Sequence, residues 1–127
     1  MKKLTMILIL LVSMTSFSFG ADKIIASSYE VPHAIRGVWY VVVSSPDSGL
    51  VPGQPLYSVT RKLISTKYGS LEVAKVNTHQ IDGDIAYAIF TEDPSKKLLL
   101  ANENGHLILY YLINDKVSFK ALIELRQ

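Results

Sequence analysis

The 127-residue chain contains thirteen Lys and Arg residues, eleven Asp and Glu residues, no cysteine, and a net charge of +2. The lack of cysteine excludes disulfides, thiol catalysis and thiolate-bound zinc. Two of the positive charges are Lys2 and Lys3, so residues 21–127 are formally neutral. A neutral chain without a basic run argues against nucleic acid or an anionic membrane surface as its main partner.

The first twenty residues have the pattern of a secretory signal peptide. Two lysines precede an apolar run over residues 4–12, which is too short to span a bilayer. Ser18 and Gly20 place small residues at the −3 and −1 positions of a cleavage site. An uncleaved anchor is the alternative, but polar residues follow the apolar run. We therefore expect a periplasmic or secreted protein, with residues 21–127 as a single domain and no membrane span after cleavage.

The first expected strands lie on either side of Pro32. Residues 23–31 favour a short strand, and residues 35–45 favour a longer one that contains Trp39, the only tryptophan. Both faces of this longer strand are apolar, so it should be covered on both sides or belong to a closed sheet. A turn-rich loop rich in proline and glycine follows over residues 46–55.

Residues 56–68 leave two alternatives open. Val59 and Ile64 are β-branched and favour strands, whereas the spacing of Leu56, Val59 and Leu63 is typical of a helix face. We favour strands, because the neighbouring segments are strands.

From residue 71 onward, expected strands alternate with short turns. The strands cover residues 71–79, 84–91, 97–101, 106–113 and 117–126, and the turns lie at 82–83, 92–95, 102–105 and 114–115. The chain should therefore be all-β, with seven to eight antiparallel strands. Hairpin connections predict a small up-and-down β-barrel or a curled meander, with a β-sandwich as the alternative.

Gly37-Val38-Trp39 on the first long strand resembles the Gly-x-Trp signature of lipocalins and the wider calycin group. The resemblance implies a lipocalin-like, eight-stranded barrel with Gly37 and Trp39 at one end. It also implies that a basic residue near the end of the last strand packs over the indole. Arg126 has the matching place along the chain.

No residue pattern indicates catalysis or metal binding. His33, His79 and His106 lie on different expected segments and lack ligand spacing. No serine lies in a nucleophile motif, and no glycine-rich loop is of the phosphate-binding type. We therefore expect no catalytic residue, no metal, no cofactor, and a protein that is not an enzyme.

Two classes of function remain. The first is an exported binding module for an apolar or amphipathic small ligand, held by side chains of the barrel interior. The residues expected there are Tyr87, Ile89, Leu109, Tyr111 and Phe119. The second class is a protein-interaction module, such as an inhibitor or accessory subunit, that acts through its outer sheet and the 46–55 loop.

The tyrosines add one expectation about the sheet. Tyrosine is amphipathic and common in binding surfaces, and the chain has seven. Tyr110 and Tyr111 are adjacent, so they must point to opposite faces. In a barrel, one of them would face the interior and the other the outside.

Overall fold

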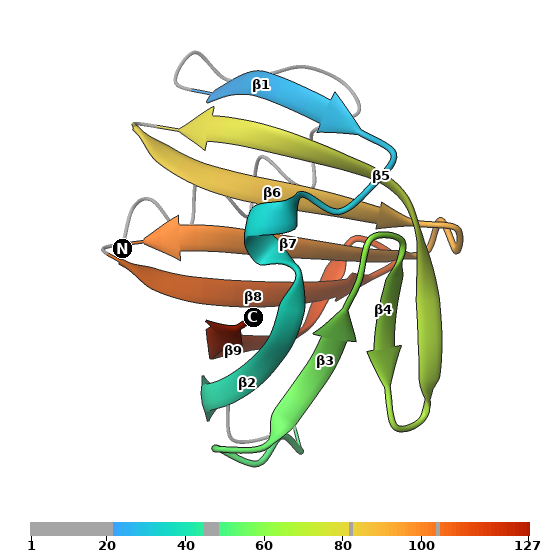
Figure 1. The fold of residues 1–127 in the computed structure, drawn as a ribbon, viewed down its shortest axis with the longest axis vertical. Helices are drawn as coiled ribbons and strands as arrows, with labels where there is room; N and C mark the ends of the chain where they lie inside the picture. Colours follow the sequence, from blue (N-terminus) through green and yellow to red (C-terminus); the bar gives the residue numbers. More distant parts are fainter. Residues whose placement is uncertain (1–21, 45–48, 82, 104) are drawn as a thin grey trace.

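The computed structural model describes residues 22–44, 49–81, 83–103 and 105–127 (Figure 1). The expected signal peptide, residues 46–48 of the turn-rich loop, and two turn residues, Asp82 and Asn104, lie outside the described residues. The described part forms nine strands and one short 3-10 helix. These elements are β1 (Asp22–Ser28), η1 (His33–Ile35), β2 (Gly37–Ser44), β3 (Pro55–Val59), β4 (Leu63–Thr66), β5 (Gly69–Ile81), β6 (Asp84–Thr91), β7 (Lys96–Glu103), β8 (His106–Ile113) and β9 (Lys116–Arg126).

Eight of the strands close into an antiparallel barrel. Hydrogen-bonded neighbours follow the order β5-β4-β3-β2-β9-β8-β7-β6, and β6 also pairs with β5. The long strand β5 belongs to the closed barrel because one edge pairs with β6 over Val73–Ile81 and the other pairs with β4 over Gly69–Glu72. Beyond β4, this second edge pairs with β1 over Val76–Ile81. β1 is thus an extra strand beside the barrel. The predicted small antiparallel barrel is confirmed, and the chain is not a sandwich.

The ambiguous residues 56–68 are strands, as favoured. β3 and β4 form a short hairpin in which Val59 pairs with Ile64, and both side chains are buried. Leu63, which belongs to the helical spacing, is exposed.

The meander from β6 to β9 is also confirmed. Its last turn is formed by Asn114 and Asp115, whose φ angles are 52° and 64°. Positive φ at both central residues is the requirement of a tight hairpin turn that follows the twist of its strands.

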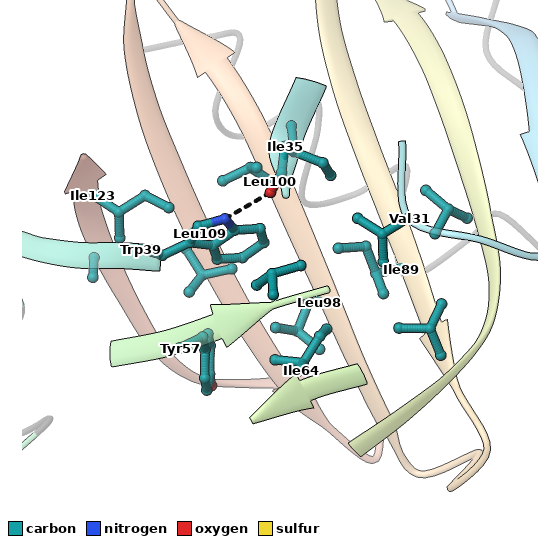
Figure 2. Close-up of a cluster of buried hydrophobic side chains, with 14 residues drawn as sticks. Val31, Ile35, Trp39, Tyr57, Ile64, Ile89, Leu98, Leu100, Leu109 and Ile123 are labelled. Atoms are coloured by element: carbon teal, nitrogen blue, oxygen red, sulfur yellow. Dashed lines mark hydrogen bonds between the residues drawn. The ribbon is translucent and has the colours of Figure 1, made fainter. Parts of the chain in front are cut away.

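The barrel interior is a packed cluster of side chains around Trp39 (Figure 2). Trp39 is 0% exposed, which confirms the expected burial. Its indole Nε1 donates a hydrogen bond to the carbonyl oxygen of Ile35 at 2.9 Å, and its ring meets Tyr57 edge-on at a centroid distance of 6.1 Å. Val31 and Ile35, from the segment between β1 and β2, belong to the same cluster, so this segment covers the tryptophan end of the barrel.

A second buried cluster lies on the outward faces of β5 to β8. Its members alternate along the strands with the interior residues and are Ile81, Ala86, Ala88, Leu99, Ala101, Tyr110 and Leu112. Tyr111 packs against the interior cluster instead. The expected division of Tyr110 and Tyr111 between the two faces is therefore confirmed.

The predicted contact between Arg126 and Trp39 is wrong. Arg126 pairs with Val38 across β2 and β9, and paired residues point to the same face, whereas Trp39 points to the other. The guanidinium lies over the ring of Tyr40, at 4.3 Å from its centroid, and forms an ion pair with Glu124 at 3.4 Å. Arg126 therefore lies on the outside of the barrel.

Gly37 does contribute to the barrel end, through its backbone. Its φ of 135° lies in a region that L residues rarely adopt, and a Cβ there would collide with the carbonyl oxygen of Arg126. The glycine thus permits the close approach of β2 to the end of β9.

Candidate functional site

A hollow of about 730 Å³ lies against the part of the barrel wall formed by β2, β3 and β4. This volume is within the range of small-molecule sites, roughly 300–1,000 Å³. Its walls come from β2, residues 49–54, β3, the end of β4 and the following turn. The lining residues are Val38, Tyr40, Val41, Gly49, Leu50, Val51, Gln54, Pro55, Leu56, Tyr57, Ser58, Ser65, Thr66, Lys67 and Tyr68.

The sheet register explains why polar side chains line this hollow. Ser58 pairs with Val38 on one side and with Ser65 on the other. These three residues form a row across the sheet on the face opposite Trp39, because paired residues share a face. The hollow is therefore built largely from the outward face of the wall.

A register shift in the pairing of β2 with β3 connects the hollow to the barrel interior. Trp39 pairs with Tyr57, but the next residue, Tyr40, pairs with Pro55, so Leu56 is skipped. The side chain of a residue skipped in this way need not follow the regular alternation between the two faces of the sheet. Leu56 both lines the hollow and packs against the interior cluster.

Residues 49–54 form a fixed wall of the hollow because they are bonded to β2. The amide of Val41 donates to the carbonyl of Gln54 at 3.0 Å, and the amide of Gly53 donates to the carbonyl of Val41 at 2.7 Å. The Ser44 hydroxyl donates to the carbonyl of Leu50 at 3.3 Å. Gly53 has a φ of 85°, which favours glycine at this turn.

The chemistry of the described lining is mostly apolar, with hydroxyl and amide groups and one charge. Burial raises the pKa of the Tyr57 phenol well above its ordinary value, and the neighbouring Tyr111 raises it further. The phenol therefore stays neutral. Lys67 is the one charged residue of the described lining, and its ammonium lies 5.1 Å from the ring centroid of Tyr68. Tyr68 itself is 88% exposed, at the rim of the hollow.

The five residues expected to bind a ligand inside the barrel lie elsewhere. The structure brings Tyr87, Ile89, Leu109, Tyr111 and Phe119 together in the interior cluster, where the rings of Tyr111 and Phe119 are 5.3 Å apart. None of the five lines the hollow. Their role in ligand binding stays a prediction.

Sequence reasoning missed most of the residues that line the hollow. One signal could have pointed to it: Tyr40, Tyr57 and Tyr68 all lie close in the sequence to the 46–55 loop. The strand pairing that gathers them could not be read from their spacing, because residues 56–68 were ambiguous.

The three histidines remain apart in the fold. His33 is exposed on η1, His79 is buried on β5, and His106 is exposed at the start of β8. Among the described residues, no group of histidine and acidic side chains comes together in a way that could hold a metal ion. The same part of the chain contains no helix long and apolar enough to cross a membrane.

Comparison with protein-family models, with curated proteins and with solved structures gave no match to this chain. The resemblance to lipocalins therefore stays a prediction from the Gly37-Val38-Trp39 motif.

Proposed function

We propose that this protein is a small exported binding module that holds an apolar or amphipathic small molecule in the hollow between β2, β3, β4 and residues 49–54. The observation that carries the proposal is the composition of the hollow. It combines an apolar wall with a few convergent polar groups in a volume suited to a small ligand. Export is supported by the signal-peptide pattern of residues 1–20.

The wall of the hollow is a better candidate than the barrel interior. Small barrels commonly fill their interior with side chains, and the interior cluster here includes Leu98, Leu100 and Leu109, all fully buried. A ligand inside would have to displace such close-packed side chains. The hollow needs no such displacement.

The size of ligand follows from the energy of apolar burial. Each buried methylene contributes about 0.8 kcal/mol, and micromolar affinity corresponds to about 8 kcal/mol. A chain of about ten carbons is therefore the appropriate probe. Decanoate, decanol and decyltrimethylammonium provide this chain with three different head groups.

The proposal is tested by measuring, with calorimetry, how these probes bind to the unaltered protein and to a variant in which a large side chain fills the hollow. Ser65→Trp places a large ring among the lining residues, and Ser118→Trp is the control, because Ser118 is an exposed serine on β9 away from the hollow. We expect at least one probe to bind the unaltered protein and the control, and to bind Ser65→Trp at least about tenfold more weakly. Equal binding to both variants would contradict the proposal. Ser58→Phe serves the same purpose if Ser65→Trp does not fold.

One observation favours the alternative, a protein-interaction module. Within the described residues β1 pairs with β5 alone, so its other edge is open. Ile24, Ile25 and Tyr29 are 50%, 46% and 75% exposed. An open edge with apolar side chains can accept an extended segment of another protein as an added strand. A partner that co-purifies from the cell of origin and is released by Ile25→Lys would support this alternative.

A further inference from the structure

We propose that the ligand of the hollow carries an anionic head group, which binds at the β4–β5 end of the hollow through Lys67 and neighbouring hydroxyl groups. This inference rests on the proposed function and assigns the chemical class of the ligand.

The first observation is the charge of the described lining. Lys67 is its one charged residue, and no carboxylate of the described residues lines the hollow with it. None of the ion pairs among the described residues involves Lys67. An anion that enters the hollow therefore meets a cation without a competing described carboxylate, whereas a cationic ligand meets repulsion.

A second cation lies next to the lining. Arg126 is stacked on the ring of Tyr40, a lining residue, at 4.3 Å. Its ion pair with Glu124 joins two side chains that are 60% and 55% exposed, so water screens the pair. Glu124 also pairs with Tyr40 across β2 and β9, so its negative charge offsets that of Arg126, and Arg126 is not the expected head-group contact.

The third observation is the number of neutral hydroxyl groups close to Lys67. Ser58 and Ser65 both line the hollow, and their side chains are neighbours because the two residues pair across β3 and β4. Both can donate to an anionic oxygen. Hydrogen bonds to charged acceptors are stronger than those between neutral groups.

The turn after β4 fixes the position of Lys67. The Thr66 hydroxyl donates to the carbonyl of Gly69 at 3.2 Å and accepts from the amide of Tyr68 at 3.0 Å. These bonds close the turn around Lys67, whose ammonium lies near the exposed ring of Tyr68. The apolar chain of a ligand would then lie along Tyr40, Leu50 and Leu56, with its charged end at this turn.

The neutrality of residues 21–127 is compatible with this site. Overall charge determines attraction to extended anionic surfaces, but a single head group responds to the charges within a few ångströms. The proposed ligand is therefore a single anionic amphiphile and not a membrane surface.

The test compares the three ten-carbon probes on the unaltered protein, on Lys67→Gln and on Lys62→Gln, by calorimetry at two salt concentrations. Lys62 is an exposed lysine between β3 and β4 that does not line the hollow, so it is the matched control. We expect decanoate to bind about tenfold more tightly than decanol and decyltrimethylammonium to bind weakest. Lys67→Gln should abolish the roughly tenfold preference for decanoate over decanol, and Lys62→Gln should keep that preference.

Two outcomes would overturn the inference. Equal binding of decanoate and decanol to the unaltered protein would show that the hollow does not recognise an anion, while the proposed function would stand. A preference for decanoate that survives Lys67→Gln would show that another group binds the anion. Failure of all three probes to bind would overturn the proposed function itself.

Discussion

The indole of Trp39 is fully enclosed and has its polar atom satisfied. It is 0% exposed, and its N–H is bonded to the carbonyl of Ile35. Trp39→Ala should therefore reduce the free energy of unfolding by about 3–5 kcal/mol, as for other large buried aromatic residues. Urea denaturation measures this, with Trp39→Phe as a variant that keeps much of the ring packing. A loss below about 1 kcal/mol for Trp39→Ala would show that the indole is not a core residue.

The stacking of Arg126 on Tyr40 can be separated from any effect on Trp39. Because the guanidinium is exposed, we expect a coupling free energy of about 0.5–1 kcal/mol between Arg126→Ala and Tyr40→Leu in a double-mutant cycle. The same cycle with Trp39→Phe should give no coupling. If Arg126→Ala were coupled to Trp39→Phe and not to Tyr40→Leu, the guanidinium would contact the indole, as the lipocalin resemblance implies.

Two tyrosines should ionise late in an alkaline titration. Burial raises the pKa of Tyr57, with a further contribution from Tyr111, and burial followed by the charge of Glu103 raises the pKa of Tyr110 to about 12. In the unfolded chain both phenols ionise near pH 10, so the unfolded state holds fewer protons above that pH. The stability that these residues contribute is therefore complete below pH 10 and is lost as pH rises toward their folded values.

Ultraviolet absorbance titration measures this delay. Of the seven tyrosines, we expect Tyr57 and Tyr110 to ionise well above pH 10, and Tyr57→Phe should remove one of these two high-pH transitions. Ionisation of all seven near pH 10 in the folded protein would contradict the burial of both phenols.

At the level of single residues, the sequence predicted what depends on local chemistry. The burial of Trp39 follows from a unique large aromatic residue on a strand that is apolar on both faces, whereas the close approach of Arg126 to the Gly37 backbone was not predicted. The partner of Arg126 could not be predicted in the same way, because it depends on the register of β2 against β9. Trp39 pairs with Leu125, so Arg126, one residue further, points to the opposite face.

Among the elements, the β8–β9 hairpin offers the clearest test of local structure. Asp115 has a φ of 64° and accepts a hydrogen bond from the Lys97 ammonium at 2.8 Å. Asp115→Ala should lower the free energy of unfolding by about 1–2 kcal/mol, because alanine is disfavoured in this left-handed conformation. Asp115→Asn should cost less than about 1 kcal/mol, since asparagine tolerates the conformation, keeps an oxygen that can accept from Lys97, and loses an ion pair whose Asp115 side chain is 52% exposed. Equal losses in thermal unfolding would refute the role of the turn.

Strand β2 shows why an apolar run did not fully predict burial. Both of its faces were expected to be covered, but Val43 is 58% exposed. The pairing of β2 with β9 shifts register between Val41 and Val43, and this shift places the end of the strand outside the regular wall. Such a shift depends on the partner strand and leaves no mark in the spacing of the valines.

The short hairpin of β3 and β4 was ambiguous for a related reason. The strands have five and four residues, which is too few to distinguish a period of two from a period of 3.6. Since β3, β4 and the register shift at Leu56 form the hollow, the candidate site could not be located before the strands were known. The composition of the 46–55 loop predicted only that a turn-rich segment lies there.

At the scale of the molecule, the sequence predicted the meander better than its closure. The connections from β6 to β9 are short hairpins with recognisable turn residues. Closure instead requires that β2 and β9, the first and last barrel strands in the sequence, pair with each other. Long-range pairing of this kind is set by the complementarity of distant strands. A closed barrel was expected from the hairpin connections, which do not determine which strand pairs with β2.

Export is a second property of the whole molecule that can be measured. Expressed in a bacterial host with a periplasm, the chain should lose residues 1–20 and be recovered from the periplasm or the medium. Intact mass determines this directly, and Gly20→Arg, which places a large charged residue at the −1 position, should block the cleavage. A full-length product that remains in the cytoplasm would contradict the proposed export.

The most direct test of the binding function is amide chemical-shift mapping by NMR during titration with decanoate. We predict that the largest changes occur at residues of the hollow, above all Tyr40, Leu56, Ser65 and Tyr68, and that they saturate with a single binding constant. Largest changes at Ile89, Leu109 and Phe119 would instead place the ligand inside the barrel, and no change at any position would show that the hollow does not bind this class of molecule.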